Sequence, residues 1–108
     1  MYARIVTFRL DGPSREAYHD HAVAIAESFN HWPGLRSVVW LAHQGGSRYG
    51  GIYLFDSAVD ADASREAPEF LSLQKLPVYK DVLIEEFDVL DEPTALTGGW
   101  FVTSSQAA

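Results

Sequence analysis

The fold of this chain is decided by residues 40–55, whose sequence is WLAHQGGSRYGGIYLF. The residues on both sides of the central glycines are largely β-branched, aromatic or aliphatic, which is typical of two strands joined by a turn. We therefore expect a β-hairpin with strands at residues 35–43 and 50–55. Gly50 and Gly51 leave the second strand without side chains there, which indicates a bulge or a close approach of another group to the backbone.

Working outward, a strand and a helix are expected before the hairpin. Residues 2–10 are rich in large apolar side chains on both faces, which is typical of a central strand covered on both sides. A turn follows at residues 11–13 and Ser14 is a suitable helix cap. Apolar residues then recur at helical spacing along one stripe, which predicts a helix to about residue 30: Tyr18, Ala22, Ile25 and Phe29.

A second helical segment and a last strand are expected after the hairpin. Ser57 can cap the segment, and Pro68 divides it into two short helices near residues 58–67 and 69–76. The final strand is predicted at residues 82–89. The order strand, helix, strand, strand, helix, strand is that of a ferredoxin-like βαββαβ unit, an α+β fold with an antiparallel sheet whose first and third strands are central.

The length of 108 residues favours a single domain. We assign residues 1–92 to it and residues 93–108 to a C-terminal tail, whose Trp100-Phe101-Val102 could form an extra strand, an arm on a partner subunit or a lid. One sheet face would remain uncovered by the helices, so a second copy of the chain is the expected partner, in a homodimer.

Charge and composition exclude several classes of partner. The formal net charge is −7, with 8 basic and 15 acidic residues, and this charge repels nucleic acid and anionic membranes. We therefore expect no nucleic acid and no membrane partner, and no apolar run is long enough to span a bilayer. Cysteine is absent and residues 1–6 lack a signal-peptide pattern, so we expect a cytoplasmic protein.

Few side chains offer a catalytic signature. His21 borders the apolar helix stripe and could act as a general base in a pocket under the sheet, or be a half-exposed histidine without a role. His19 and His21 diverge on a helix, so we expect no metal site. Arg4 and Arg9 lie on opposite faces of the first strand, and each would pair with a carboxylate or a ligand anion. No nucleotide, flavin or nicotinamide fingerprint is present, so no cofactor is expected.

Short motifs resemble, in order along the chain, those of the YdhR-like monooxygenases: Ala26-Glu27-Ser28 with Asn30, Pro33-Gly34, Val39-Trp40, residues 50–55 and Phe87-Asp88-Val89. The resemblance covers most of residues 1–90. It implies the dimeric α/β-barrel superfamily, which also contains antibiotic-biosynthesis monooxygenases. In this arrangement two sheets form a barrel between two subunits, and each subunit has a pocket between its sheet and its helices.

The resemblance implies a cofactor-independent monooxygenase-like enzyme that acts on a small aromatic or polyphenolic, quinol-type substrate. Trp40, Tyr53 and Tyr18 would hold the aromatic ring, His21 would be the base and Arg9 would stabilise the anion. Trp40 and Tyr53 could equally be core residues, and Trp40 an interface residue. Two other functions remain open: a cofactor-free polyketide cyclase or aldolase, and a non-catalytic dimeric protein that binds a small apolar ligand.

Overall fold

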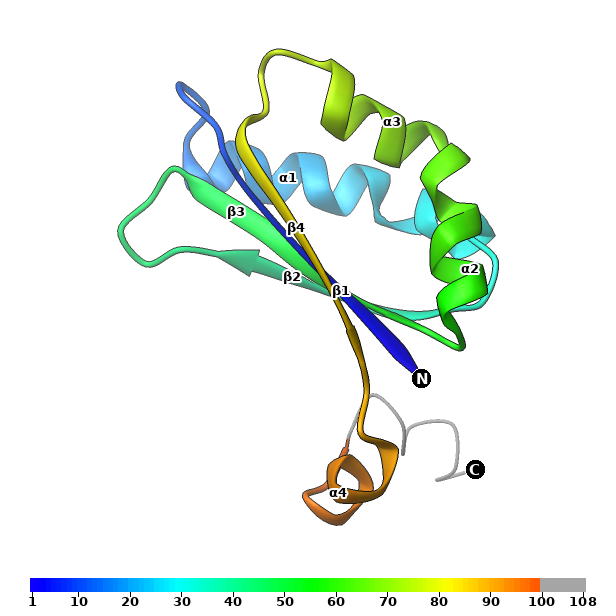
Figure 1. The fold of residues 1–108 in the computed structure, drawn as a ribbon. Coiled ribbons are helices and arrows are strands. Elements are labelled where there is room, and N and C mark those ends of the chain that lie inside the picture. Colours follow the sequence, from blue (N-terminus) through cyan, green and yellow to red (C-terminus); the bar gives the residue numbers. More distant parts are fainter. Residues whose placement is uncertain (100–108) are drawn as a thin grey trace.

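The computed structural model describes residues 1–99, so the predicted arm, lid or strand at residues 100–102 lies outside the described residues. Figure 1 shows a sheet with helices packed on one face and a last short helix beyond its end. The elements, in order, are β1 (Tyr2–Arg9), α1 (Arg15–Ile25), the 3₁₀ helix η1 (Ala26–His31), β2 (Leu35–Ala42), β3 (Arg48–Phe55), α2 (Ala58–Ala63), the 3₁₀ turn η2 (Ser64–Glu66), α3 (Pro68–Lys75), β4 (Lys80–Asp88) and α4 (Asp91–Leu96).

The four strands form one antiparallel sheet in the order β2-β3-β1-β4. This order confirms the ferredoxin-like α+β fold and the central position of the first and third strands. The register pairs Arg4 with Tyr53 and with Glu86, and Gly51 with Trp40. Because paired residues point to the same face of a sheet, these side chains lie on one face.

That face carries the helices. Figure 1 shows α1 and α3 lying across the same side of the sheet. Arg4, Val6 and Phe8 of β1 point toward them and are buried, whereas the alternate side chains of β1 are only half-buried. On β4, two of the residues that pair with these alternate residues are exposed: Leu83 is 51% exposed and Phe87 is 48% exposed. The opposite face therefore leaves large apolar side chains in solvent.

The first helical segment is not one continuous α-helix to residue 30. α1 ends at Ile25, and the chain continues as the 3₁₀ helix η1 to His31. Side chains three residues apart lie on one side of a 3₁₀ helix, and this spacing lets Phe29 and Trp32 both reach the core, where each is 6% exposed. The Ser28 hydroxyl donates to the carbonyl of Ile25 at 2.7 Å within this segment.

The second helical segment divides at Pro68, as predicted. The Ser57 hydroxyl accepts from the backbone N–H of Asp60 at the start of α2, and Pro68 is the first residue of α3. Proline is suited to this position because its missing N–H would have no helical partner there. α3 is thereby held over the sheet from its first turn.

A short helix follows β4 where the sequence predicts only a stop and a tail. Asp91 and Glu92 lie in the first turn of α4, where the helix dipole favours acidic side chains, and Pro93 follows them. The amino group of Met1 forms an ion pair with Asp91 at 3.0 Å. α4 thus spans the boundary we placed at residue 92. Within residues 1–99, none of the helices has the length and apolarity needed to traverse a bilayer.

A buried ion pair lies between the sheet and α2. Arg4 is 0% exposed, and its Nε donates to Glu86 at 2.8 Å. Its other nitrogens donate to the Ser64 hydroxyl at 2.8 Å and to the Ala61 carbonyl at 2.6 Å. The guanidinium also lies 4.6 Å from the ring centre of Phe70. Each nitrogen of the guanidinium has a partner within the protein, so Arg4 is held by the fold and is not free to bind a ligand.

Candidate functional site

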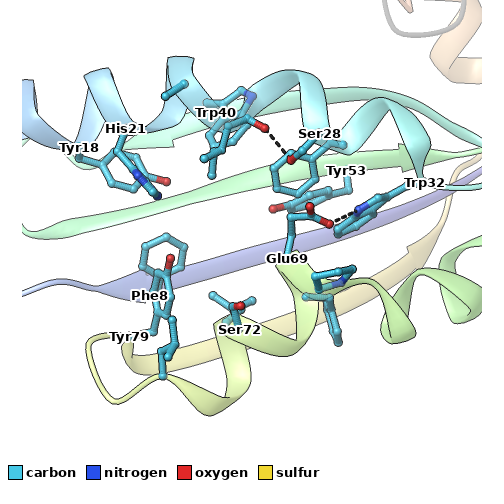
Figure 2. A pocket seen from close by; sticks show the side chains of 17 residues that line it. Phe8, Tyr18, His21, Ser28, Trp32, Trp40, Tyr53, Glu69, Ser72 and Tyr79 are labelled. Carbon is cyan, nitrogen blue, oxygen red and sulfur yellow. Dashed lines mark hydrogen bonds between the residues drawn. The ribbon is translucent and has the colours of Figure 1, made fainter.

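A cavity of about 500 Å³ lies between the sheet and the helices. Its size is within the usual range for a small-molecule site. Phe8, Trp40 and Tyr53 form its floor on the strands, and α1, η1 and α3 form its other walls (Figure 2). The remaining lining residues are Tyr18, His21, Ala24, Ile25, Ser28, Phe29, Trp32, Pro68, Glu69, Phe70, Ser72, Leu73, Leu76 and Tyr79.

Four of the five predicted site residues line this cavity: Tyr18, His21, Trp40 and Tyr53. Tyr18 and His21 come from α1, three residues apart, and therefore lie on one face of that helix. Trp40 comes from β2, where its partner on β3 is Gly51. The missing side chain at residue 51 leaves the helix-facing side of the sheet open beside the indole ring.

Arg9 does not line this cavity. It follows Phe8 on β1 and so points to the opposite face of the sheet. Its guanidinium binds Asp81 at 3.0 Å and also forms an ion pair with Asp11. Arg9 therefore lies beside two surface carboxylates. The predicted role, stabilising the substrate anion, requires Arg9 to lie in the cavity with His21, and the structure does not bring these two residues together.

Aromatic rings hold one another in place around the cavity. Trp32 stacks on Tyr53 with ring centres 5.6 Å apart and an angle of 9° between the planes. Phe29 meets Trp40 edge-on at 5.5 Å, and Tyr18 stacks on Tyr49 at 4.2 Å. Such contacts fix ring orientation, so the cavity walls are preorganised for a flat ligand.

The tyrosine hydroxyls of the cavity remain protonated at neutral pH. Burial raises the pKa of Tyr53 to about 12, although the charge of Arg4 opposes this shift. Burial also raises the pKa of Tyr18 and of Tyr79. Among residues 1–99 neither Tyr18 nor Tyr53 uses its hydroxyl in a hydrogen bond to the protein. These hydroxyls are therefore available as donors to a ligand.

Sequence reasoning missed a polar group at one end of the cavity. The indole N–H of Trp32 donates to the Oε1 atom of Glu69 at 2.9 Å (Figure 2). Desolvation acts to raise the pKa of Glu69, but hydrogen bonds from Trp32 and from its own backbone N–H act against it and hold that pKa below its usual value. The side chain is thus a carboxylate at neutral pH.

The wall of the cavity has two polar ends. Figure 2 shows His21 and Tyr18 at one end, and Ser28, Glu69 and Trp32 at the other, with Trp40 and Tyr53 between them. The rest of the lining is mainly aromatic and aliphatic. Within residues 1–99, no group of three histidine and acidic side chains is arranged to hold a metal ion.

Comparison with solved structures gives the same fold. The haem degrader MhuD from Mycobacterium tuberculosis is 17% identical with a TM-score of 0.65, over 83% of this chain and 96% of that chain. The cofactor-independent oxygenase SnoaB from Streptomyces nogalater is 15% identical with a TM-score of 0.65, over 83% and 93%. A protein from Nitrosomonas europaea described as a "putative antibiotic biosynthesis monooxygenase" is 17% identical with a TM-score of 0.67, over 84% and 91%.

No curated protein sequence matches this chain. One family does match: the sequence model described as "Putative mono-oxygenase ydhR" covers residues 5–100, which includes all the strands and helices described above except the first three residues of β1. It extends past residue 92 and so includes α4. The match spans most of the chain and agrees with the fold, and this protein belongs to the ydhR mono-oxygenase family.

Proposed function

We propose that this protein is a cofactor-independent monooxygenase that oxidises a small aromatic, quinol-type substrate in the cavity between the sheet and the helices. The observation that carries this proposal is the convergence of His21, Tyr18, Trp40 and Tyr53 on one aromatic cavity, with His21 at its solvent-exposed edge. Membership of the ydhR family supports the reaction class. The description of SnoaB, which has this fold, supports the absence of a cofactor from the reaction.

The aromatic walls would bind and orient the ring of the substrate. Trp40 and Tyr53 offer flat surfaces, and both are held by contacts with Phe29 of η1. A stacked aromatic pair contributes about 0.5–1.5 kcal/mol beyond the burial of its area. A ring bound against these walls would also exclude water from the side that it covers, which strengthens hydrogen bonds to a developing anion there.

His21 would remove the proton that activates the substrate. No other residue among 1–99 binds its ring nitrogens, so the neutral imidazole can accept a proton from a phenolic hydroxyl. The hydroxyls of Tyr18 and Tyr53 can donate to the resulting phenolate, a role for which we expected Arg9. A phenolate is electron-rich enough to reduce O₂ directly.

The proposed reaction balances without an external reductant. A quinol with a free ring C–H reacts with one O₂ to give a hydroxyquinone and one water. One oxygen atom forms a new bond to the ring carbon, and the other leaves as water with two hydrogens from the substrate. The substrate gives up four electrons, which is the number that O₂ accepts.

Oxygen uptake with a panel of naphthohydroquinones, using ¹⁸O₂ and mass spectrometry of the product, tests this function. We expect one ¹⁸O atom in the hydroxyquinone and a rate above that of uncatalysed autoxidation. His21→Ala should lower kcat by at least about 100-fold, the usual size of a general-base effect. His19→Ala is the matched control, because His19 is exposed and does not line the cavity.

Three results would contradict the proposal. Oxygen uptake that gives the quinone and hydrogen peroxide without ¹⁸O in the ring is autoxidation. Turnover under anaerobic conditions would favour the cyclase or aldolase. Tight binding with no product, unchanged in His21→Ala, would favour the non-catalytic ligand-binding protein.

The uncovered sheet face supports a homodimer. Ile5, Ile52, Leu83 and Phe87 lie on this face, opposite the helices, as the register of the strands requires. A chain of 108 residues with so many apolar side chains in solvent gains stability when a second sheet covers them. We infer that two copies pack through these faces, while each copy keeps its own cavity on the helix side.

A further inference from the structure

We propose that Glu69 makes this cavity selective for aromatic ligands with an uncharged hydroxyl at the end away from His21, and makes it reject ligands with a carboxylate there. This inference rests on the cavity being the ligand site of the proposed function and names the substrate class more narrowly. The inference depends on one observation. The carboxylate of Glu69 forms part of the cavity wall, and the protein uses only part of its capacity to accept hydrogen bonds.

Glu69 is the one formally charged side chain among the lining residues within residues 1–99, with histidine counted as neutral. No arginine or lysine in this part of the chain forms an ion pair with it. The nearby cations Arg4 and Arg65 are both bound to Glu86. The charge of Glu69 is therefore balanced mainly by hydrogen-bond donors and not by an arginine or lysine.

The protein leaves acceptor capacity on this carboxylate. A carboxylate has about four lone-pair positions. The indole of Trp32 occupies one at Oε1, whereas the Ser28 hydroxyl donates its proton to the carbonyl of Ile25. A ligand hydroxyl would add a charge-assisted hydrogen bond, which is roughly twice as strong as a neutral one. A ligand carboxylate would instead meet a like charge in a partly desolvated site.

The position of Glu69 sets where the hydroxyl must lie. Ser28 follows His21 by seven residues, four in α1 and three in η1, which is about 12 Å at rises of about 1.5 and 2.0 Å per residue. Glu69 lies beside Ser28 (Figure 2). A ligand that reaches both polar ends would be about two fused rings long. Its first hydroxyl would meet His21 and its second would meet Glu69.

Anaerobic titration with two symmetric, redox-stable ligands tests this selectivity independently of turnover. The ligands are 2,6-dihydroxynaphthalene and naphthalene-2,6-dicarboxylate, and because both ends of each are identical, neither ligand can avoid Glu69 by turning round. We expect the wild-type protein to bind the diol at least tenfold more tightly. Glu69→Gln should reduce this preference at least tenfold, since the glutamine oxygen still accepts from Trp32 while its amide donates to a carboxylate.

Two further variants make the test specific. Glu69→Asp keeps the charge and should keep the preference for the diol. Glu66→Gln removes one negative charge from the neighbouring turn η2, outside the cavity, and should also keep it. Equal binding of the two ligands by the wild-type protein, no binding of either, or an unchanged preference in Glu69→Gln would overturn the inference.

The titration separates this inference from the proposed reaction. A preference that depends on Glu69, without oxygen uptake on any quinol, would support the selectivity and refute the monooxygenase. Oxygenation of quinols with no dependence of ligand preference on Glu69 would support the monooxygenase and refute the selectivity.

Discussion

At the scale of single residues, the most consequential side chain outside the cavity is Glu86. It accepts hydrogen bonds from Tyr2 and Arg4 and forms an ion pair with Arg65. Desolvation acts to raise its pKa, but the hydrogen bonds from Arg4 and Tyr2 and the two positive charges hold the pKa of Glu86 below its ordinary value. The fold therefore depends on this carboxylate being ionised.

Glu86→Gln should lower the free energy of unfolding at pH 7 by about 3 kcal/mol, because it leaves Arg4 buried without a negative partner. Urea denaturation followed by circular dichroism measures this change. Glu27→Gln is the control, since Glu27 is exposed and has no ion pair among residues 1–99, and its effect should stay within about 0.5 kcal/mol.

The effect of Glu86 should depend on pH in one direction. A carboxylate whose pKa is lower in the folded protein contributes stability above its ordinary pKa, and this contribution is lost as the pH falls through the folded value. The difference between wild type and Glu86→Gln should therefore be largest near pH 7 and shrink toward pH 3. A difference that grows on acidification would contradict the ion-pair account.

At the scale of elements, the hairpin of β2 and β3 explains the two consecutive glycines. A Cβ atom at Gly50 would lie 2.0 Å from the carbonyl oxygen of Val6 on β1, and one at Gly51 would lie 3.2 Å from the ring of Tyr53. Gly50 thus permits the close pairing of β3 with β1. Gly51 keeps the space beside Trp40 and Tyr53 free.

Gly50→Ala should destabilise the protein by at least about 2 kcal/mol, because the backbone of β1 must move to admit the methyl group. Gly45→Ala, in the turn of the same hairpin, should cost less than about 1 kcal/mol, since its nearest neighbours are the ring atoms of His43. Thermal unfolding of the two variants compares them directly. Equal losses of stability would show that the approach of β1 is not what requires Gly50.

Most of the elements could be predicted from the sequence because their signals are local. The β-branched and aromatic composition of the strands, the helix stripe that includes Tyr18, and Pro68 each act through near neighbours in the chain. The change from α1 to η1 could not be predicted, because it depends on Phe29 and Trp32 packing into the same core. α4 was missed because Pro93 suits the first turn of a helix as well as the end of a strand.

Part of the candidate site could also be predicted from the sequence. Helix periodicity and the family motifs suffice to find His21 and Trp40. The opposite orientation of Arg4 and Arg9 was also predicted, but a strand with apolar residues on both sides does not reveal which face carries the helices. Glu69 had no sequence signal, because its partner Trp32 is 37 residues away and only the packing of α3 on η1 brings them together.

At the scale of the whole molecule, the proposed homodimer predicts a particle of about twice the 12.0 kDa mass of one chain. Sedimentation velocity measures this mass. Leu83→Lys places a charge on the uncovered sheet face, where Leu83 is 51% exposed on the edge strand β4, and should shift the protein toward monomer. Val23→Lys, on the exposed side of α1, should leave the dimer intact. A monomeric wild-type protein would refute the proposed dimer.

The central claim is that the cavity between the sheet and the helices is where the aromatic ligand binds. The most direct measurement is a crystal structure of the protein soaked anaerobically with 2,6-dihydroxynaphthalene. The account predicts the rings between Trp40 and Tyr53, with one hydroxyl at His21 and the other at Glu69 (Figure 2). Ligand density confined to the opposite sheet face, or a cavity filled only by water at saturating ligand, would contradict it.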